Sequence, residues 1–177
     1  MATNDGWQKE TDWSTVEALH ENLSEQEILD WYKTFGNFLN VVAHTDPAAG
    51  KRFFELEDYT IWDLMGNLKR GNLGPHYDHI TPYLGKTNQS FKNVEIVAVT
   101  PDFGYITSMQ RVHGTATDGS PYDMTFRATS LVRKVGADGE WKLIHEHYSF
   151  PVDMATKVAD FTSSQALSEN VEFQKKA

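Results

Sequence analysis

The fold is decided by the stretch Met124-Thr-Phe-Arg-Ala-Thr-Ser-Leu-Val-Arg-Lys-Val-Gly-Ala-Asp-Gly-Glu-Trp-Lys-Leu-Ile-His-Glu-His-Tyr-Ser-Phe150. Two runs rich in β-branched and aromatic residues flank a short turn, in which Gly136 and Gly139 can adopt positive φ. This pattern predicts a β-hairpin. Because a strand presents alternate residues to each face, some ionisable side chains of the two arms should face inward. We therefore expect a polar-lined pocket rather than a dry core beside this hairpin.

The segments before the hairpin favour helices. Ser24 and Glu27 have capping-box spacing, and apolar residues recur every three or four positions to about residue 43. Asp46 and Pro47 suit the first turn of a second helix. A short strand over residues 59–64, a glycine-rich loop and a third helix over residues 75–84 follow.

From residue 91 the pattern changes to strands, expected over 94–99, 105–115, 122–135 and 140–149. Helices followed by an antiparallel meander predict an α+β fold. The expected architecture is a cone-shaped, barrel-like roll, in which a curved antiparallel sheet wraps around three helices and leaves a ligand cavity. The expected organisation is an N-terminal extension over residues 1–23, one domain over 24–151, and a tail or terminal helix over 152–177.

Composition limits the function. The net charge of −9 makes nucleic acid an unsuitable partner, since phosphate binding needs clustered Lys and Arg. The sequence has no cysteine, no signal-like N-terminus and no apolar run of the ~20 residues that span a bilayer. We expect a cytoplasmic protein that does not bind membranes.

The last strand also carries a family resemblance. Arg127-Ala-Thr129 and Gly139-Glu-Trp141-Lys-Leu-Ile-His145-Glu-His147-Tyr-Ser149-Phe-Pro151 resemble the end of a SnoaL-like domain, in the superfamily of nuclear-transport-factor-like and ketosteroid-isomerase-like proteins. Residues 75–77 and 104–110 resemble the association domain of calcium/calmodulin-dependent protein kinase. The resemblance covers about residues 24–151 and implies the cone-shaped fold, whereas this fold hosts many reactions.

Asp63 is the first candidate for catalysis. Thr60-Ile-Trp-Asp63-Leu-Met-Gly66 is similar to the ketosteroid isomerase segment that carries the Asp general base. An Asp pressed into an apolar, aromatic site becomes a stronger base, whereas the alternative is an ordinary turn carboxylate. The resemblance does not extend to steroid isomerisation itself, because the isomerase's protonated Asp and helix Tyr fall near Thr129 and Phe38.

Histidines supply further candidates. His79 and His113 could transfer protons, and the resemblance to the association domain places His76 at the mouth of the pocket. His76 and His79 share a helix face, but no third ligand with zinc-site spacing follows, so no metal and no cofactor is predicted.

Substrate-binding candidates come from the first helix and the sheet. Tyr32 and Trp62 could contact a substrate, although Tyr32 also suits the core. The resemblance to the association domain implies that Thr107 points into the cavity, and strand alternation would then bring Arg111 inward as well. On the next strand Arg127 and Thr129 share a face and are expected to line the pocket, whereas a charge-paired outer surface is the alternative for both arginines.

The last strand leaves its orientation open. One face carries His145 and His147, and the other carries Glu146 and Tyr148. The resemblance to the isomerase favours Glu146 as a catalytic residue and Tyr148 as a pocket residue, but a single β-bulge would reverse the faces. A buried Glu146 would need a partner, because an unpaired buried carboxylate is costly.

Two functions follow. The favoured one is a cofactor-independent enzyme, such as a polyketide cyclase, an isomerase or a dehydratase (a lyase), that moves protons on a small carbonyl-bearing secondary metabolite. The alternative is a non-catalytic domain for ligand binding or association. In either case, resemblance to the superfamily implies a homodimer formed through the sheet.

Overall fold

The computed structural model describes residues 20, 22–71 and 86–163. Within these residues, three helical segments come first, followed by eight strands. The helical segments are the α-helix α1 (Leu23–Asn37), the π-helical turn η2 (Phe38–Val42) and the 3-10 helix η3 (Pro47–Phe53). The strands are β1 (Thr60–Trp62), β2 (Leu68–Arg70), β3 (Lys86–Thr100), β4 (Phe103–Thr115), β5 (Pro121–Val135), β6 (Glu140–Ser149), β7 (Val152–Asp153) and β8 (Val158–Ala159).

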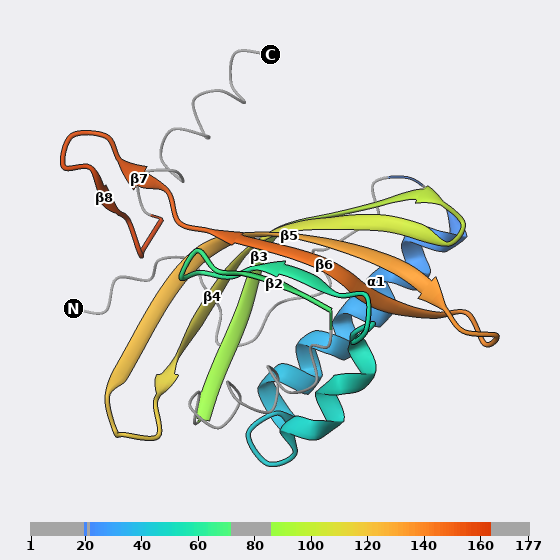
Figure 1. The fold of residues 1–177 in the computed structure, drawn as a ribbon, viewed down its shortest axis with the longest axis horizontal. Helices are drawn as coiled ribbons and strands as arrows, with labels where there is room; N and C mark the ends of the chain where they lie inside the picture. The colour runs from blue at the N-terminus through green and yellow to red at the C-terminus, as the bar shows by residue number, and fades with distance from the viewer. Residues whose placement is uncertain (1–19, 21, 72–85, 164–177) are drawn as a thin grey trace.

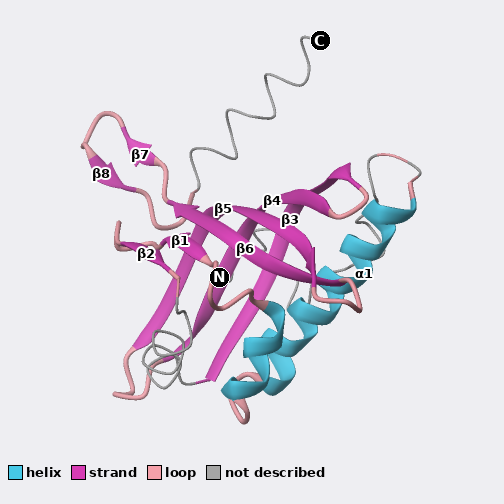
Figure 2. Ribbon diagram, turned by 45° about the vertical axis from the view of Figure 1, so that its right-hand side comes forward, coloured by secondary structure: helices cyan, strands magenta, loops and turns pink. Residues whose placement is uncertain are grey.

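Six strands form one open, curved sheet in the order β2-β1-β6-β5-β4-β3. The long strands β3 to β6 make the predicted antiparallel meander, and the helical segments lie together on one side of it (Figures 1 and 2). The α+β class and the curved sheet are thus confirmed. The sheet is mixed rather than purely antiparallel, because β1 runs parallel to β6. The third expected helix lies outside the described residues.

The predicted start of α1 is wrong by two residues. Asn22 is the N-cap, and its Oδ1 accepts the Glu25 N–H at 2.8 Å. Ser24 instead lies within the helix and donates to the Pro101 carbonyl at 3.4 Å. The cap shifted because Glu25, three residues after Asn22, is the acidic residue that points into the structure.

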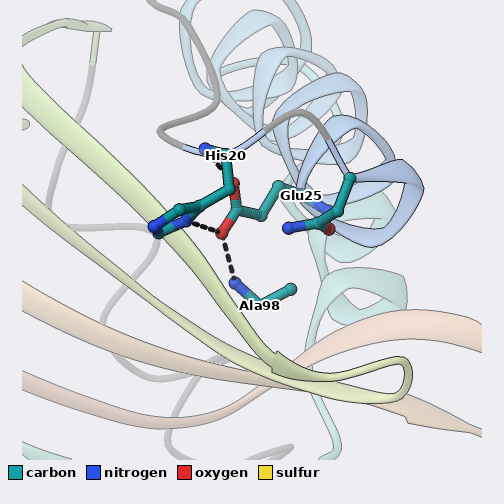
Figure 3. A network of polar contacts seen from close by, with 4 residues as sticks. His20, Glu25 and Ala98 are labelled. Carbon is teal, nitrogen blue, oxygen red and sulfur yellow. Dashed lines mark hydrogen bonds and ion pairs between the residues drawn. The ribbon is translucent and has the colours of Figure 1, made fainter.

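Glu25 joins the start of α1 to the edge strand β3. Its carboxylate accepts the Ala98 N–H at 3.0 Å and the His20 N–H at 2.8 Å, and it lies 2.9 Å from His20 Nδ1 (Figure 3). The side chain is completely buried. Burial alone would raise the pKa of Glu25, but the hydrogen bonds from the His20 ring, from Ala98 and from the His20 amide together hold that pKa below its usual range.

Asn40 makes a second connection to the same edge. Its Oδ1 accepts the Gln89 N–H at 2.7 Å, and its Nδ2 donates to the Gln89 carbonyl at 2.8 Å. The side-chain amide of Asn40 therefore makes with Gln89 the two hydrogen bonds that the backbone of a neighbouring strand would make. Together Glu25 and Asn40 hold the helical layer against β3 and pair backbone groups that an edge strand would otherwise leave open.

An aromatic core fills the space between α1, η3 and the sheet. Phe35 packs 5.1 Å from Phe53, and Phe54 makes an edge-to-face contact with Tyr59 at 5.3 Å between ring centroids. The helix lies so close to β4 that a Cβ on Gly104 would stand 2.5 Å from the Val97 carbonyl oxygen and 2.8 Å from Ile28 Cδ1. Gly104 therefore marks the face of β4 that looks toward α1.

The chain after β6 differs from the expected tail or helix. Residues 152–159 form the β7–β8 hairpin, which projects from the sheet at the end away from η2 and η3 (Figures 1 and 2). The next residues return to β5, where Thr125 N–H donates to the Phe161 carbonyl at 2.7 Å and Ser163 Oγ donates to the Thr125 carbonyl at 2.8 Å. Residues 164–177 lie outside the described part. No helix in the described residues has the length and hydrophobicity needed to cross a membrane.

Replacing Glu25 should destabilise the fold. Glu25→Ala leaves the partly buried Ala98 N–H without its acceptor, so the free energy of unfolding in urea should fall by about 1–3 kcal/mol. The matched control is Ser24→Ala in the same turn, where the residue is half-exposed and its long hydrogen bond to Pro101 lies at the surface, so this variant should change the free energy of unfolding by less than about 0.5 kcal/mol. Because the folded-state pKa of Glu25 is lowered, its contribution is complete above the ordinary value of 4.5 and is lost as the pH falls below it. Equal stability of the two variants would contradict this role.

Candidate active site

A β-bulge at Ile144 determines which side chains of β6 face the helices. Leu131 pairs with His145 and Val132 pairs with Leu143, so Ile144 is the extra residue on β6. The bulge consequently reverses the alternation of faces along β6. The side chains that face α1 are Trp141 and Leu143 before the bulge, at odd positions, and Glu146 and Tyr148 after it, at even positions. The open question about the last strand is thereby answered: Glu146 and Tyr148 face inward.

Glu146 is the centre of a buried polar cluster. Its side chain is 2% exposed. Tyr59 donates its hydroxyl to Oε2, and Ser130 Oγ donates to Oε1 at 3.1 Å. Tyr148 lies two residues along the same face, and its hydroxyl acts on the carboxyl group of Glu146 by lowering the pKa of that group. The cluster therefore joins the segment before β1 to strands β5 and β6.

Burial sets the protonation of this cluster. It raises the pKa of Glu146, although the hydroxyls of Tyr59, Tyr148 and Ser130 act in the opposite direction by favouring the charged form. Burial, and then the charge of Glu146, raises the pKa values of Tyr59 and Tyr148. The tyrosines thus remain protonated hydrogen-bond donors, while Glu146 is a carboxyl group whose proton is retained to higher pH than usual. That combination is typical of acid–base sites.

A second, amide-based cluster adjoins the first. Gln110 of β4 accepts a hydrogen bond from Gln89 Nε2 at 2.6 Å, and its own Nε2 donates to Tyr32 Oη and to Ser108 Oγ, both at 3.3 Å. Tyr32 Oη and Ser108 Oγ lie 3.4 Å apart. Burial is the main cause that raises the pKa of Tyr32, and the negative charge of Glu146 raises it further. Tyr32 is 1% exposed and belongs to the core, as the alternative expectation had it, and its contact with a substrate stays a prediction.

The cationic and polar candidates on β4 and β5 lie on the opposite face. Because Gly104 faces α1, the inward residues of β4 are Ile106, Ser108 and Gln110. The expectation that the odd-numbered residues point inward is wrong for Thr107, Arg111 and His113. Thr107 Oγ1 donates to Glu95 at 3.4 Å on the outer face. Arg111 binds both carboxylate oxygens of Asp123, at 2.9 and 2.7 Å, and His113 lies opposite Asp123 in the register.

The same correction applies to the neighbouring strands. Arg127 and Thr129 are exposed, because Ala128 and Ser130 take the inner face of β5. Arg127 donates to the Phe150 carbonyl at 3.3 Å. Trp62 is 43% exposed, because Ile61 is the residue of β1 that turns into the core. These side chains lie on the outer surface rather than in the pocket, and of the two arginines Arg111 has the carboxylate partner that the alternative required.

Asp63 lies in the turn between β1 and β2. Its Oδ1 accepts the backbone N–H groups of Met65 and Asn67 at 2.9 and 2.8 Å, and Oδ2 accepts Asn67 Nδ2 at 3.2 Å. The expectation of an Asp pressed into an apolar site is wrong, because both oxygens hold the turn and the side chain is only partly buried. His76 and His79 lie outside the described residues.

Sequence reasoning missed several members of the two clusters: Tyr59, Gln89, Ser108, Gln110 and Ser130. One signal was available, since Arg111 and Asp123 stand at diagonal positions of neighbouring strands, a spacing typical of surface ion pairs. An ion pair between Arg111 and Asp123 indicates that the odd-numbered residues of β4 face the surface. The even-numbered residues of β4 are then expected on the inner face. Within the described ranges no three His, Cys, Asp or Glu side chains gather as metal ligands.

Comparison with known proteins agrees with this architecture. Residues 80–153 match the family model of the SnoaL-like domain. Among solved structures, an NTF2-like protein of unknown function from Pseudomonas putida KT2440 is 22% identical, with a TM-score of 0.61 over 78% of this chain and 94% of that one. A ketosteroid isomerase-like protein from Erwinia carotovora atroseptica is 18% identical, with a TM-score of 0.58 over 72% and 96% of the two chains.

A third similar structure is an assembly module. The association domain of CaMKII from C. elegans is 17% identical, with a TM-score of 0.54 over 72% of this chain and 99% of that one. No curated protein sequence matches the chain. The fold is that of these NTF2-like and ketosteroid isomerase-like structures, and residues 80–153 are similar to the SnoaL-like domain.

The raised pKa of Glu146 predicts a specific pH dependence of stability. The folded protein holds the Glu146 proton more tightly than the unfolded chain, so this group's contribution to stability is largest below 4.5 and declines as the pH rises through the folded-state pKa. Glu146→Gln should remove that decline, measured by urea unfolding between about pH 5 and about pH 8. Glu140→Gln, an exposed change on the same strand, should retain it. A decline of equal size in all three proteins would refute the assignment.

Proposed function

We propose that this protein is an enzyme that moves protons on a small, carbonyl-bearing molecule, with Glu146 as the acid–base group. The observation that carries the proposal is a buried carboxyl group held by the hydroxyls of Tyr59 and Ser130 on the inner face of the sheet. The two hydrogen bonds fix the position of the carboxylate, and burial gives it the proton affinity that a general base requires.

The proposed reaction begins at a carbon next to the carbonyl group. Glu146 removes a proton from that carbon, the C–H electron pair forms a carbon–carbon double bond, and the carbonyl oxygen becomes an enolate. Tyr32 donates a hydrogen bond to that oxygen, and Tyr148 turns its hydroxyl from Glu146 to the same oxygen once Glu146 has taken up the proton, because burial keeps both phenols protonated. Their role is to stabilise the negative charge as it develops.

The fate of the enolate decides the type of reaction. Return of the Glu146 proton to another carbon is an isomerisation, and loss of a β-hydroxyl group as water, with that proton, is a dehydration. Attack of the enolate carbon on a second carbonyl within the molecule is a cyclisation, in which the new alkoxide oxygen takes the proton from Glu146. The SnoaL-like match favours a polyketide-like substrate, and the ketosteroid isomerase-like neighbour is consistent with proton transfer.

Proton abstraction can be tested with a simple ketone. In deuterium oxide the protein should accelerate exchange of the protons next to the carbonyl of β-tetralone, followed by NMR. Glu146→Gln should lower the rate by about 10²–10⁴, the usual contribution of a positioned base. Glu140→Gln should leave it unchanged.

Two results would count against the proposed function. One is equal exchange by wild type and Glu146→Gln, which would remove Glu146 from the chemistry. The other is tight binding of ketones with no exchange and no turnover across a panel of polyketides, which would favour the alternative of a ligand-binding or association domain.

We also propose that two copies pair through the outer face of the sheet. The exposed Thr129 lies on β5 at the centre of this face. Trp62, which is 43% exposed, lies on β1, on the other side of β6 from Thr129. An open sheet whose outer face exposes an aromatic side chain beside a small neutral one suits a self-complementary interface.

Light scattering should therefore give the mass of a dimer at micromolar concentration. Thr129→Lys should shift the protein to monomers, because it places two like charges near the twofold axis. Thr115→Lys at the exposed end of β4 is the control and should remain dimeric. A wild-type monomer in this measurement would contradict the proposal.

A further inference from the structure

We infer that His145 and His147 form a binding site for a divalent transition metal ion on the outer face of the sheet. The inference goes beyond the proposed function, because the two histidines lie on the opposite side of β6 from the Glu146 cluster. It follows from the alternation of β6 after the bulge, from the uncharged side chains that stand beside the pair, and from the chemistry of the imidazole ring.

Both histidines project from the same side of one strand. Glu146, which lies between them in the sequence, is buried and faces α1, so strand alternation turns His145 and His147 to the outer face. Residues two apart on a strand have Cα atoms about 7 Å apart. Two imidazole rings at this spacing can converge on one ion, because a ring nitrogen lies several bonds from its Cα and binds zinc at about 2.0–2.1 Å.

The two rings differ in exposure. His145 is half-buried between its register partners Thr60 of β1 and Leu131 of β5, whereas His147 is exposed. Burial lowers the pKa of His145, and the charge of His147 lowers it further. An uncharged ring keeps the lone pair that a metal ion requires, so His145 is available as a ligand at neutral pH. His147 gives the ion access from the solvent.

The surroundings of the pair suit a cation. The four side chains that stand beside it in the register of β1 and β5 are uncharged: Thr60, Trp62, Thr129 and Leu131. The next outward residues along β5 are Arg127 and Arg133, and both guanidinium groups are engaged. Arg127 donates to the Phe150 carbonyl at 3.3 Å, and Arg133 binds Asp58 at 3.0 Å. The net charge of −9 also attracts cations to the protein.

The imidazole ligands determine the kind of ion. Imidazole nitrogen suits copper, zinc and nickel, whereas magnesium and calcium prefer oxygen ligands. Among these divalent ions copper(II) binds such nitrogens most tightly. Within the described residues no third His, Cys, Asp or Glu joins the pair. The other positions of the ion are therefore left to water or, in the proposed dimer, to a group of the second copy, and the ion is exchangeable rather than structural.

Copper(II) is the probe for this site. Isothermal titration of the full chain at neutral pH should give a dissociation constant at least about tenfold lower for the wild type than for His147→Asn, which removes one of the two ligands. Two controls should leave the constant unchanged. His44→Asn alters an exposed histidine between η2 and η3, and His79→Asn breaks the other closely spaced histidine pair of the sequence. A large excess of magnesium should not displace the copper.

Trp62 reports where the ion binds. It is the register partner of His147 on β1, and bound copper(II) quenches the fluorescence of a nearby indole ring. Trp62→Phe should therefore remove most of the quenching, while the dissociation constant from calorimetry stays the same.

A third ligand can be added from the neighbouring strand. Thr129 lies directly opposite His147, where the Cβ atoms of paired residues are about 5 Å apart. Thr129→His should tighten copper(II) binding by about tenfold or more, because it completes a three-imidazole site. Thr107→His, one strand farther away on the same face, is the matched control and should not tighten it.

Three results would overturn the inference: equal copper(II) affinity in the wild type and a folded His147→Asn, loss of binding in His79→Asn alone, or equal tightening by Thr129→His and Thr107→His. Circular dichroism verifies that His147→Asn is folded. The added-ligand comparison decides the question if that variant does not fold, since it keeps both native histidines.

Discussion

The extra residue Ile144 in β6 is the constraint on which the interior depends. A regular strand alternates its faces, so if it turned Leu143 into the core it would turn Glu146 and Tyr148 outward. The bulge allows one strand to contribute Trp141 and Leu143 to the aromatic core and, a few residues later, Glu146 and Tyr148 to the polar cluster. The boundary between the apolar and the polar half of the interior is therefore set by a local irregularity of the backbone.

The helical layer has to stay in register with that sheet for the clusters to form. Tyr32 reaches Ser108 and Gln110 from α1, so a sliding helix would separate them. The contacts of Glu25 with Ala98 and of Asn40 with Gln89 prevent this, because each fixes one end of the helical segment to the same strand. The polar contacts at the sheet edge thus position the donors above Glu146.

The sequence was most informative where local chemistry decides structure. Turn residues and alternating apolar residues predicted the meander, and helical spacing predicted α1, because these patterns act over a few residues. The site was harder to predict, since strand parity depends on tertiary packing: Gly104 against Ile28 turns Arg111 outward, and the bulge turns Glu146 inward. The prediction that Asp63 lies in an apolar site was wrong, because a turn carboxylate and a catalytic carboxylate can have the same local sequence.

The parallel pairing of β1 with β6 also bears on how the molecule folds. The hydrogen bond from Tyr59 to Glu146 joins residues that are 87 positions apart, with most of the sheet between them in the chain. Closing so long a loop is entropically costly until β5 and β6 have paired and present their edge. The hairpins can form from neighbouring residues, whereas the Glu146 cluster has to wait for this last strand addition. Assembly of the site is then coupled to completion of the fold, and partly folded chains lack the buried carboxyl cluster.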